Sequence, residues 1–279
     1  MKTLKYLSLI IIAFFSSCSS DEPETVTINE LQGLTLVQEM PNDTHIVELY
    51  TPTGTLQQGY NAVSLRIKDK TTGTYETDAT VSWMPVMHMA SMQHSCPFSG
   101  IAKTPGKETL YNGYIVFQMA QNDIEYWTLQ VNYTLNGNDY SVSETINVPA
   151  SSKRRVASFT GTDGSKYVIA LIEPIAPRVA VNNVTAGLFK MESMVSYPAV
   201  DGYTIKIDPR MPSMGNHGSP NNVDLTQAAD GLYNGKLSLT MSGYWKINLQ
   251  LLNTENVVVK GEPVTETVPE SSIFFEIEF

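Results

Sequence analysis

The sequence is poor in cysteine and histidine, with 2 Cys and 4 His among its 279 residues. One cysteine, Cys18, lies in the N-terminal segment, so Cys96 has no partner for an internal disulfide bond. The sequence also lacks the His-Glu-x-x-His, Gly-x-Ser-x-Gly and glycine-rich phosphate-binding motifs. These motifs carry metalloprotease, hydrolase and nucleotide chemistry. We therefore expect that the protein is not an enzyme.

Positive charge is also scarce. The chain has 18 Lys and Arg against 28 Asp and Glu, a net charge of −10. Removing residues 1–17, which include Lys2 and Lys5, lowers the basic count from 18 to 16 and the net charge to −12. Nucleic-acid binding depends on basic side chains that neutralise phosphates. The composition therefore predicts no nucleic-acid partner, and a surface that attracts cations.

Long apolar runs are absent apart from residues 7–15. This run is too short for a membrane-spanning helix, which needs about 20 apolar residues. Its length and the preceding Lys2 and Lys5 are typical of a secretory signal peptide. The run leads into Ser16-Ser17-Cys18, and this order resembles the lipobox of bacterial lipoproteins. The resemblance implies a signal peptide over 1–17 and an acylated Cys18. The alternative is an ordinary secretory signal with an incidental cysteine.

Residues 18–25 are expected to form an acidic tether. Their Asp21-Glu22-Pro23-Glu24 resembles the export signal of Bacteroidetes lipoproteins. This resemblance implies a protein of the cell envelope, held at the outer membrane by its lipid anchor, with the outer face possible. The membrane is then the first expected partner.

Amphipathic helices longer than two turns are missing, and strand patterns take their place. Apolar and polar residues alternate over 63–67, 114–117, 127–133 and 245–251, which indicates strands with one buried face. Five dipeptides that favour turns with positive φ separate such runs: Asn112-Gly113, Asn136-Gly137, Asp163-Gly164, Asp201-Gly202 and Asn234-Gly235. The sequence therefore predicts an all-β fold.

The chain also repeats itself. Leu-Tyr-Asn-Gly at 110–113 recurs at 232–235, and each copy is followed by a methionine and then by a tryptophan that begins an alternating strand. A repeat of this length indicates two related domains. We expect domains over 26–150 and 156–279 with a linker over 151–155. Many short strands and frequent turns favour two tandem immunoglobulin-like β-sandwiches.

The segment from residue 84 to 97 combines thioether, imidazole and thiol groups. Sulfur ligands select Cu(I), and imidazole binds Cu(I), Cu(II) or Zn²⁺. If the segment is extended, Met87 and Met89 lie on one face and His88 on the other. We expect a copper site formed mainly by Met87, Met89 and His94, with further candidate ligands from the same segment: His88, Met92, Cys96 and Met84.

The second copy offers fewer ligands. Met211, Met214 and His217 occupy the corresponding stretch, without a cysteine. Three ligands suffice for Cu(I), but we expect a weaker site. Gly215-Asn216 also replaces the His88-Met89 of the first copy, so part of the site is expected to be lost.

The two Met-Pro-x-Met sequences, 84–87 and 211–214, are each followed by a glycine-containing turn and a Tyr/Trp strand. This pattern resembles the YtkA-like and FixH-like family of exported domains. The resemblance implies an immunoglobulin-like sandwich in each half of the chain. It also implies a role in copper handling, oxidase maturation or metal efflux.

These observations lead to one hypothesis and one alternative. The hypothesis is a non-catalytic lipoprotein that binds copper for sequestration or for delivery to a copper-dependent oxidase or an efflux system. The alternative is a cell-surface scaffold or adhesion-type lipoprotein whose exposed aromatic residues bind polysaccharide or protein, with these candidates: Tyr111, Tyr114, Tyr126 and Tyr133. Under the hypothesis the Met and His side chains should converge, whereas under the alternative they should disperse into the cores.

Other residues receive a structural interpretation. Methionine is a flexible filler of cores, and we expect packing roles for four further methionines: Met119, Met191, Met194 and Met241. His45 is likewise expected to be structural, at the start of a strand.

Overall fold

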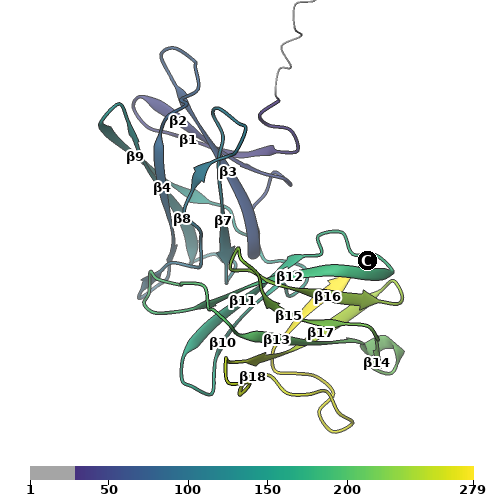
Figure 1. The fold of residues 1–279 in the computed structure, drawn as a ribbon. Helices are drawn as coiled ribbons and strands as arrows, with labels where there is room; N and C mark the ends of the chain where they lie inside the picture. The colour runs from purple at the N-terminus through teal and green to yellow at the C-terminus, as the bar shows by residue number, and fades with distance from the viewer. Residues whose placement is uncertain (1–28) are drawn as a thin grey trace, which may run out of the picture.

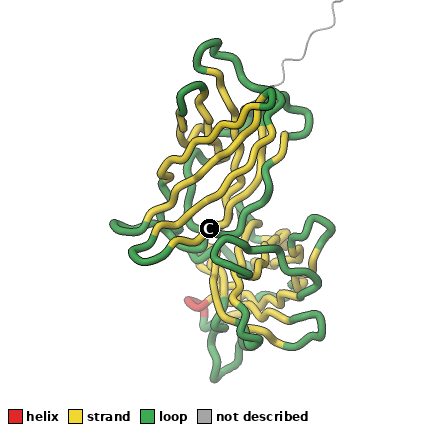
Figure 2. Tube along the Cα trace, turned by 90° about the vertical axis from the view of Figure 1, so that its left-hand side faces the viewer, coloured by secondary structure: helices red, strands yellow, loops and turns green. Residues whose placement is uncertain are grey.

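Figure 1 shows the computed structural model of the protein, which describes residues 29–279. The expected signal peptide, Cys18 and the acidic tether lie outside the described residues. Within 29–279, no helix is long and apolar enough to cross a membrane. The one helix of this part is the short 3-10 turn η1, Pro212–Met214. Figure 2 shows strands and loops almost throughout, so the all-β prediction is confirmed.

The first domain contains nine strands. They are β1 (Thr35–Pro41), β2 (His45–Thr51), β3 (Gly59–Asp69), β4 (Thr80–His88), β5 (Gln93–His94), β6 (Ala102–Lys103), β7 (Tyr111–Phe117), β8 (Tyr126–Leu135) and β9 (Asn138–Ile146). One sheet has the order β1-β2-β3-β7-β6 and the other the order β5-β4-β8-β9. In immunoglobulin lettering, β2, β3, β7 and β6 occupy positions A, B, E and D, and β4, β8 and β9 occupy C, F and G. The domain is an immunoglobulin-like sandwich.

The second domain contains ten strands. They are β10 (Val156–Thr160), β11 (Lys166–Glu173), β12 (Ala180–Lys190), β13 (Thr204–Met211), β14 (His217–Gly218), β15 (Val223–Gln227), β16 (Tyr233–Leu239), β17 (Tyr244–Leu252), β18 (Val258–Lys260) and β19 (Phe274–Glu278). The order β11-β12-β16-β15 repeats A-B-E-D, and β13-β17-β19 repeats C-F-G. Two residue pairs between β13 and β15 join the sheets at one edge. The second domain is therefore an immunoglobulin-like sandwich too.

The repeated residues have the same roles in both cores. Trp127 and Trp245 are fully buried. Each indole donates a hydrogen bond to the backbone carbonyl of the methionine that precedes it, Met119 (3.1 Å) or Met241 (2.9 Å). The repeat in the sequence thus reflects a shared core and a shared anchor for the loop before the F strand.

Two of the five expected turns are wrong. Asn112-Gly113 lies within β7 and Asn234-Gly235 within β16. Glycine is required there because of close packing: a Cβ on Gly113 would lie 2.7 Å from the Trp83 ring, and one on Gly235 would lie 2.5 Å from the Val223 carbonyl oxygen. Glycine in a strand interior often marks such a close approach.

The other three expected turns are confirmed. Asn136 and Gly137 both have positive φ, between β8 and β9. Gly164 and Gly202 also have positive φ, as a glycine after Asp in a turn predicts.

The two domains contact each other through an apolar cluster. Val116 of the first domain packs with Val156, Val168, Ala170 and Phe189 of the second. The segment between β9 and β10 is held by hydrogen bonds, since the Arg155 carbonyl accepts from the Leu171 amide at 2.8 Å. The domains therefore share a packed interface, which forms one wall of the site described next.

Candidate functional site

The β4–β5 hairpin orients the methionine-rich segment. Met87 pairs with His94 and His88 with Gln93, and the Met89 amide donates to the Met92 carbonyl at 3.0 Å. Residues directly opposite on antiparallel strands point to the same face. The hairpin therefore places four of the predicted ligands on one face: Met87, Met89, Met92 and His94.

His88 and Met84 lie on the other face of β4. The His88 ring stacks on Tyr126 with a centroid distance of 4.7 Å. Its two nitrogens lie 2.9 Å from Thr128 Oγ1 and 3.0 Å from Gln93 Nε2. Met84 is half-buried opposite Gln130. Neither residue faces the other predicted ligands.

Met87 and Cys96 are sealed in the first core. Both have 0% exposure and belong to the same apolar cluster as Trp83 and Trp127. Burial raises the pKa of the Cys96 thiol well above its usual value, so the group stays protonated at neutral pH. Metal binding requires the thiolate. The hairpin face that carries the predicted ligands is therefore divided. Its inner end, at Met87, lies in the core, whereas its outer end, at Met92, is accessible.

We expect the Cys96 thiol of the folded protein to resist a chromogenic aromatic disulfide at about pH 8, and to react fully in denaturant. Burial denies access, and the raised pKa lowers the thiolate fraction at a given pH. A Cys18→Ser chain ensures that the released chromophore reports Cys96 alone. Rapid labelling without denaturant would contradict the buried placement and restore Cys96 as a candidate ligand.

The outer end of the hairpin face opens into a pocket between the domains, with a volume of about 540 Å³. We call it the interdomain pocket. Its lining consists of Met89, Met92, His94, Gln118, Met119, Ser158, Phe159, Thr160, Lys166, Tyr167, Val168, Met191, Met194 and Tyr197. Five of the chain's 12 methionines therefore line one space.

Three of these methionines were expected only to pack. Met119 follows β7, whereas Met191 and Met194 follow β12 in the second domain. The Ser95 amide donates to the Met194 carbonyl at 2.7 Å, so the loop after β12 is attached to the β5 end of the hairpin. Met194 is 37% exposed and Met92 is 50% exposed, so thioethers of both domains remain accessible.

A short sequence pattern marks both methionine pairs. Residues 89–92 and 191–194 each read Met-x-Ser-Met. The same pattern occurs a third time at 211–214, which does not line the pocket. The pattern alone would therefore have identified the right segments together with a wrong one.

His94 is oriented by its backbone. Its Nδ1 lies 2.7 Å from the Ser95 carbonyl oxygen, a bond that requires the proton on Nδ1 and leaves the lone pair on Nε2. The ring is 7% exposed and meets the Trp127 ring edge-on at 5.9 Å. Metal-binding histidines commonly have this arrangement, in which the second nitrogen is held by an acceptor.

The lining of the interdomain pocket contains no carboxylate among the described residues, and Lys166 is its one lysine or arginine. Burial raises the pKa of Tyr197, and burial together with hydrogen bonds to Tyr203 and Asp163 raises that of Tyr167. Both phenols are therefore neutral. A sulfur-rich lining without a carboxylate suits a soft monovalent ion better than a hard divalent one.

Two of the predicted ligands of the second copy are neighbours, since Met211 on β13 pairs with His217 on β14, as Met87 pairs with His94 in the first copy. Met211 is buried in the second core at 3% exposure, whereas Met214 is 57% exposed on η1 and His217 is exposed on β14. None of them lines the interdomain pocket.

The aromatic residues of the alternative hypothesis are mostly covered. Tyr111 and Tyr133 are buried at 2% exposure, and Tyr114 packs against the interdomain cluster. Tyr126 is 43% exposed but stacks on His88. They do not form one open aromatic surface.

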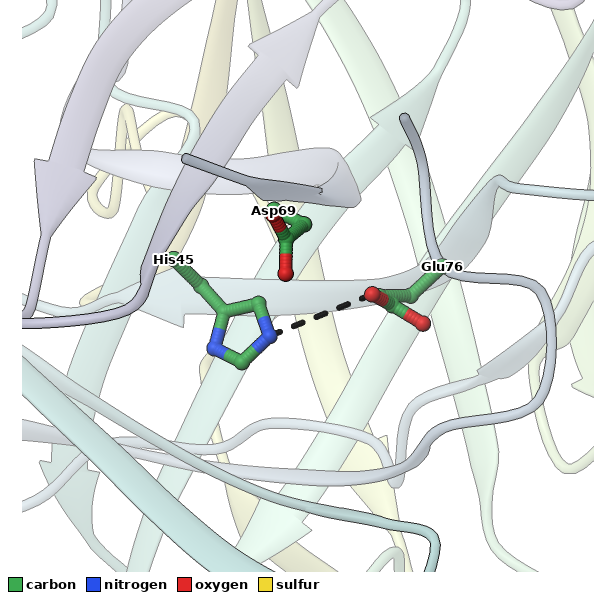
Figure 3. A group of neighbouring side chains, drawn as sticks. All are labelled: His45, Asp69 and Glu76. Carbon is green, nitrogen blue, oxygen red and sulfur yellow. Dashed lines mark ion pairs between the residues drawn. The ribbon is translucent and has the colours of Figure 1, made fainter. Parts of the chain in front are cut away.

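A second group of polar residues lies elsewhere in the first domain, and sequence reasoning gave His45 only a structural role. Figure 3 shows His45, Asp69 and Glu76 turned toward one another. Their ligand atoms all lie within 4.8 Å of one another, and His45 Nε2 is 3.9 Å from Glu76 Oε1. No local sequence pattern marks this group, because β2–β3 pairing brings His45 to Asp69 and the Glu76 amide donates back to the Ile67 carbonyl of β3 at 2.8 Å.

Comparison with known proteins gives no family for the chain. No family model matches it, and no curated protein matches it in sequence. One similar solved structure is described as "Anomalous substructure of Titin-A168169", with 11% identity, coverage of 71% of this chain and 89% of that chain, and a TM-score of 0.21. At this TM-score the likeness carries no weight, and the immunoglobulin-like fold follows from the strand order of each sandwich.

Proposed function

We propose that the protein is a non-catalytic, exported lipoprotein that binds copper as Cu(I) in the interdomain pocket. The observation that carries this proposal is the gathering of five methionines and His94 from three separate segments around one space. Thioether and imidazole are the neutral side-chain ligands that Cu(I) prefers.

The proposed ligands differ in part from those expected from sequence. Met89, Met92 and His94 remain, and Met119, Met191 and Met194 join them. Met87 and Cys96 support the hairpin from the core instead. His94 Nε2 would be the nitrogen ligand, since the Ser95 carbonyl holds Nδ1.

The location between domains gives the proposed site a way to release its ion. Met89 and Met92 come from the first domain, and Met191 and Met194 from the second. A small shift at the interface would separate the two pairs and weaken binding. We propose sequestration, or delivery to a copper-dependent oxidase or an efflux system, as the role of the site. The YtkA-like resemblance and a lipid anchor on Cys18 at the outer membrane belong to the same proposal.

The test is an anaerobic titration of the purified Cys18→Ser chain with Cu(I) against a chromophoric chelator. We expect one Cu(I) per chain, with a dissociation constant below about 1 μM, equivalent to about −8 kcal/mol. Binding of Zn²⁺ in place of Cu(I) at this pocket would contradict the soft-ion assignment.

If the protein fails to compete with the chelator for Cu(I), the copper proposal is wrong. The methionines would then be interpreted as an adaptable apolar surface for a protein partner, which is the scaffold alternative.

A further inference from the structure

We propose that His45, Asp69 and Glu76 form a second metal site, for a divalent cation of the zinc type. It is independent of the copper proposal. The three residues come from the start of β2, the end of β3 and the loop that follows β3. Figure 3 shows their polar atoms converging on one point.

The neighbours of His45 engage one of its two ring nitrogens. Asn42 Oδ1 accepts from the amides of Thr44 (3.1 Å) and His45 (2.8 Å), and also from the Thr44 hydroxyl (3.4 Å). The Thr44 hydroxyl oxygen lies 2.7 Å from His45 Nδ1. Nδ1 is therefore engaged by this hydrogen bond, and Nε2 is the ring nitrogen that faces Glu76.

The His45 ring is fixed in this direction. It is 5% exposed and contacts Tyr133 and Tyr140 edge-on, with centroid distances of 5.5 and 4.8 Å. Within residues 29–279, Nε2 has no hydrogen-bond partner, and Glu76 Oε1 at 3.9 Å is too distant for one. The ring nitrogen forms an ion pair with Glu76 when it is protonated, and a metal ion would take the place of that proton between the imidazole and the two carboxylates.

Apart from the His45 ring, the described residues offer the two carboxylates no cationic partner. In the described part of the chain, no Lys or Arg forms an ion pair with Asp69 or Glu76. Asp69 Oδ1 accepts from the amides of Thr71 and Thr72, both at 2.7 Å, so its carboxyl group is held in place while the second oxygen remains available.

The geometry and the donor types favour Zn²⁺. Imidazole and carboxylate groups both bind zinc at about 2.0–2.2 Å, and three protein ligands leave the fourth position open, whereas Mg²⁺ and Ca²⁺ prefer oxygen ligands alone. Tetrahedral coordination needs ligand atoms about 3.4 Å apart. Nε2 and Oε1 therefore need to approach by about half an ångström, and no pair of the three ligand atoms needs to approach by more than about 1.4 Å. The Glu76 side chain can rotate, since it is 26% exposed.

The site is remote from the interdomain pocket. The β3 strand begins at Gly59, whose added Cβ would lie 3.7 Å from Arg155 at the interface, and it ends at Asp69. Eleven residues at about 3.3 Å each place Asp69 roughly 30 Å from the interface end of β3. In the second domain, Tyr167 and Lys190 pair at the position of His45 and Asp69, so the second copy has no equivalent site.

The test is a titration of the Cys18→Ser chain with Zn²⁺ alone, followed by calorimetry and by the ¹⁵N shifts of the His45 ring. We expect one Zn²⁺ at this site and a large shift of Nε2. Glu76→Gln should weaken binding at least about 10-fold, because even outer-shell changes cost about 10–100-fold. Its side chain makes no hydrogen bond among the described residues, so folding should be unaffected. Asp78→Asn, with a 92% exposed carboxylate in the same loop, is the control that changes charge equally.

Three results would overturn the proposal. The first is that the protein does not bind Zn²⁺ while Glu76→Gln still shifts the titration of His45. This result would show that His45 and Glu76 form an ion pair only. Another is equal loss in Asp78→Asn, which indicates general attraction of cations. The third is Zn²⁺ binding that His94→Gln abolishes and Glu76→Gln leaves intact, which would assign the ion to the interdomain pocket.

Discussion

Replacing Met89 and Met191 together by leucine is expected to weaken Cu(I) binding by at least about 100-fold. One thioether is removed from each domain, and both belong to the lining of the interdomain pocket. Changes outside the ligand shell already cost about 10–100-fold in metal affinity, so the loss of two direct ligands should cost more. Leucine nearly preserves volume and apolar character, so stability should change by less than about 1.5 kcal/mol.

The measurement is anaerobic competition with a Cu(I) chelator, and the matched control is Met214→Leu. Met214 ends the third Met-x-Ser-Met sequence but is exposed and outside the pocket. Each single leucine variant should show an intermediate loss, since the two domains contribute separately. Equal affinity in the double variant and the control would show that Cu(I), if bound, lies elsewhere.

Met87→Ala is expected to destabilise the first domain by about 2–5 kcal/mol. Its side chain has no exposure and packs in the core with Trp127, so truncation leaves a cavity. Met92→Ala at the same hairpin should change stability by no more than about 0.5 kcal/mol, because that side chain is half exposed. Urea unfolding followed by tryptophan fluorescence measures both.

The conservative variant Met87→Leu separates packing from metal binding. It keeps the volume of the core, and we expect it to retain Cu(I) affinity and most of the stability. A fully folded Met87→Leu protein that loses Cu(I) would make Met87 a ligand and would refute the division of the hairpin into a core end and a pocket end.

Several parts of the candidate site could be predicted from sequence because they are local. The face shared by Met87 and Met89, and the opposite placement of His88, follow from the two-residue period of a strand. How deeply each residue of that face is buried does not follow from the two-residue period. Whether a thioether reaches a pocket or a core depends on what packs against the strand, and the period of the strand gives Met87 and Met89 the same face without distinguishing the two.

The Asn-Gly dipeptides show the same limit. Asn136-Gly137 forms a turn, whereas Asn112-Gly113 and Asn234-Gly235 lie within strands. Glycine serves positive φ in the first case and close packing against side chains or backbone in the others. One residue type meets two physical needs, and only the neighbours in space distinguish them.

The sequence by itself determined the all-β class and the repeated sandwich, because alternation, turn residues and recurrent core positions are properties of short segments. Only the tertiary structure decided which of those segments meet. The Met-x-Ser-Met pairs of 89–92 and 191–194 contribute to one pocket because the domains pack through Val116 and Phe189, and His45 meets Asp69 because β2 pairs with β3. Contacts between distant segments depend on the balance of many burial and pairing energies across the whole chain, and no single segment carries that information.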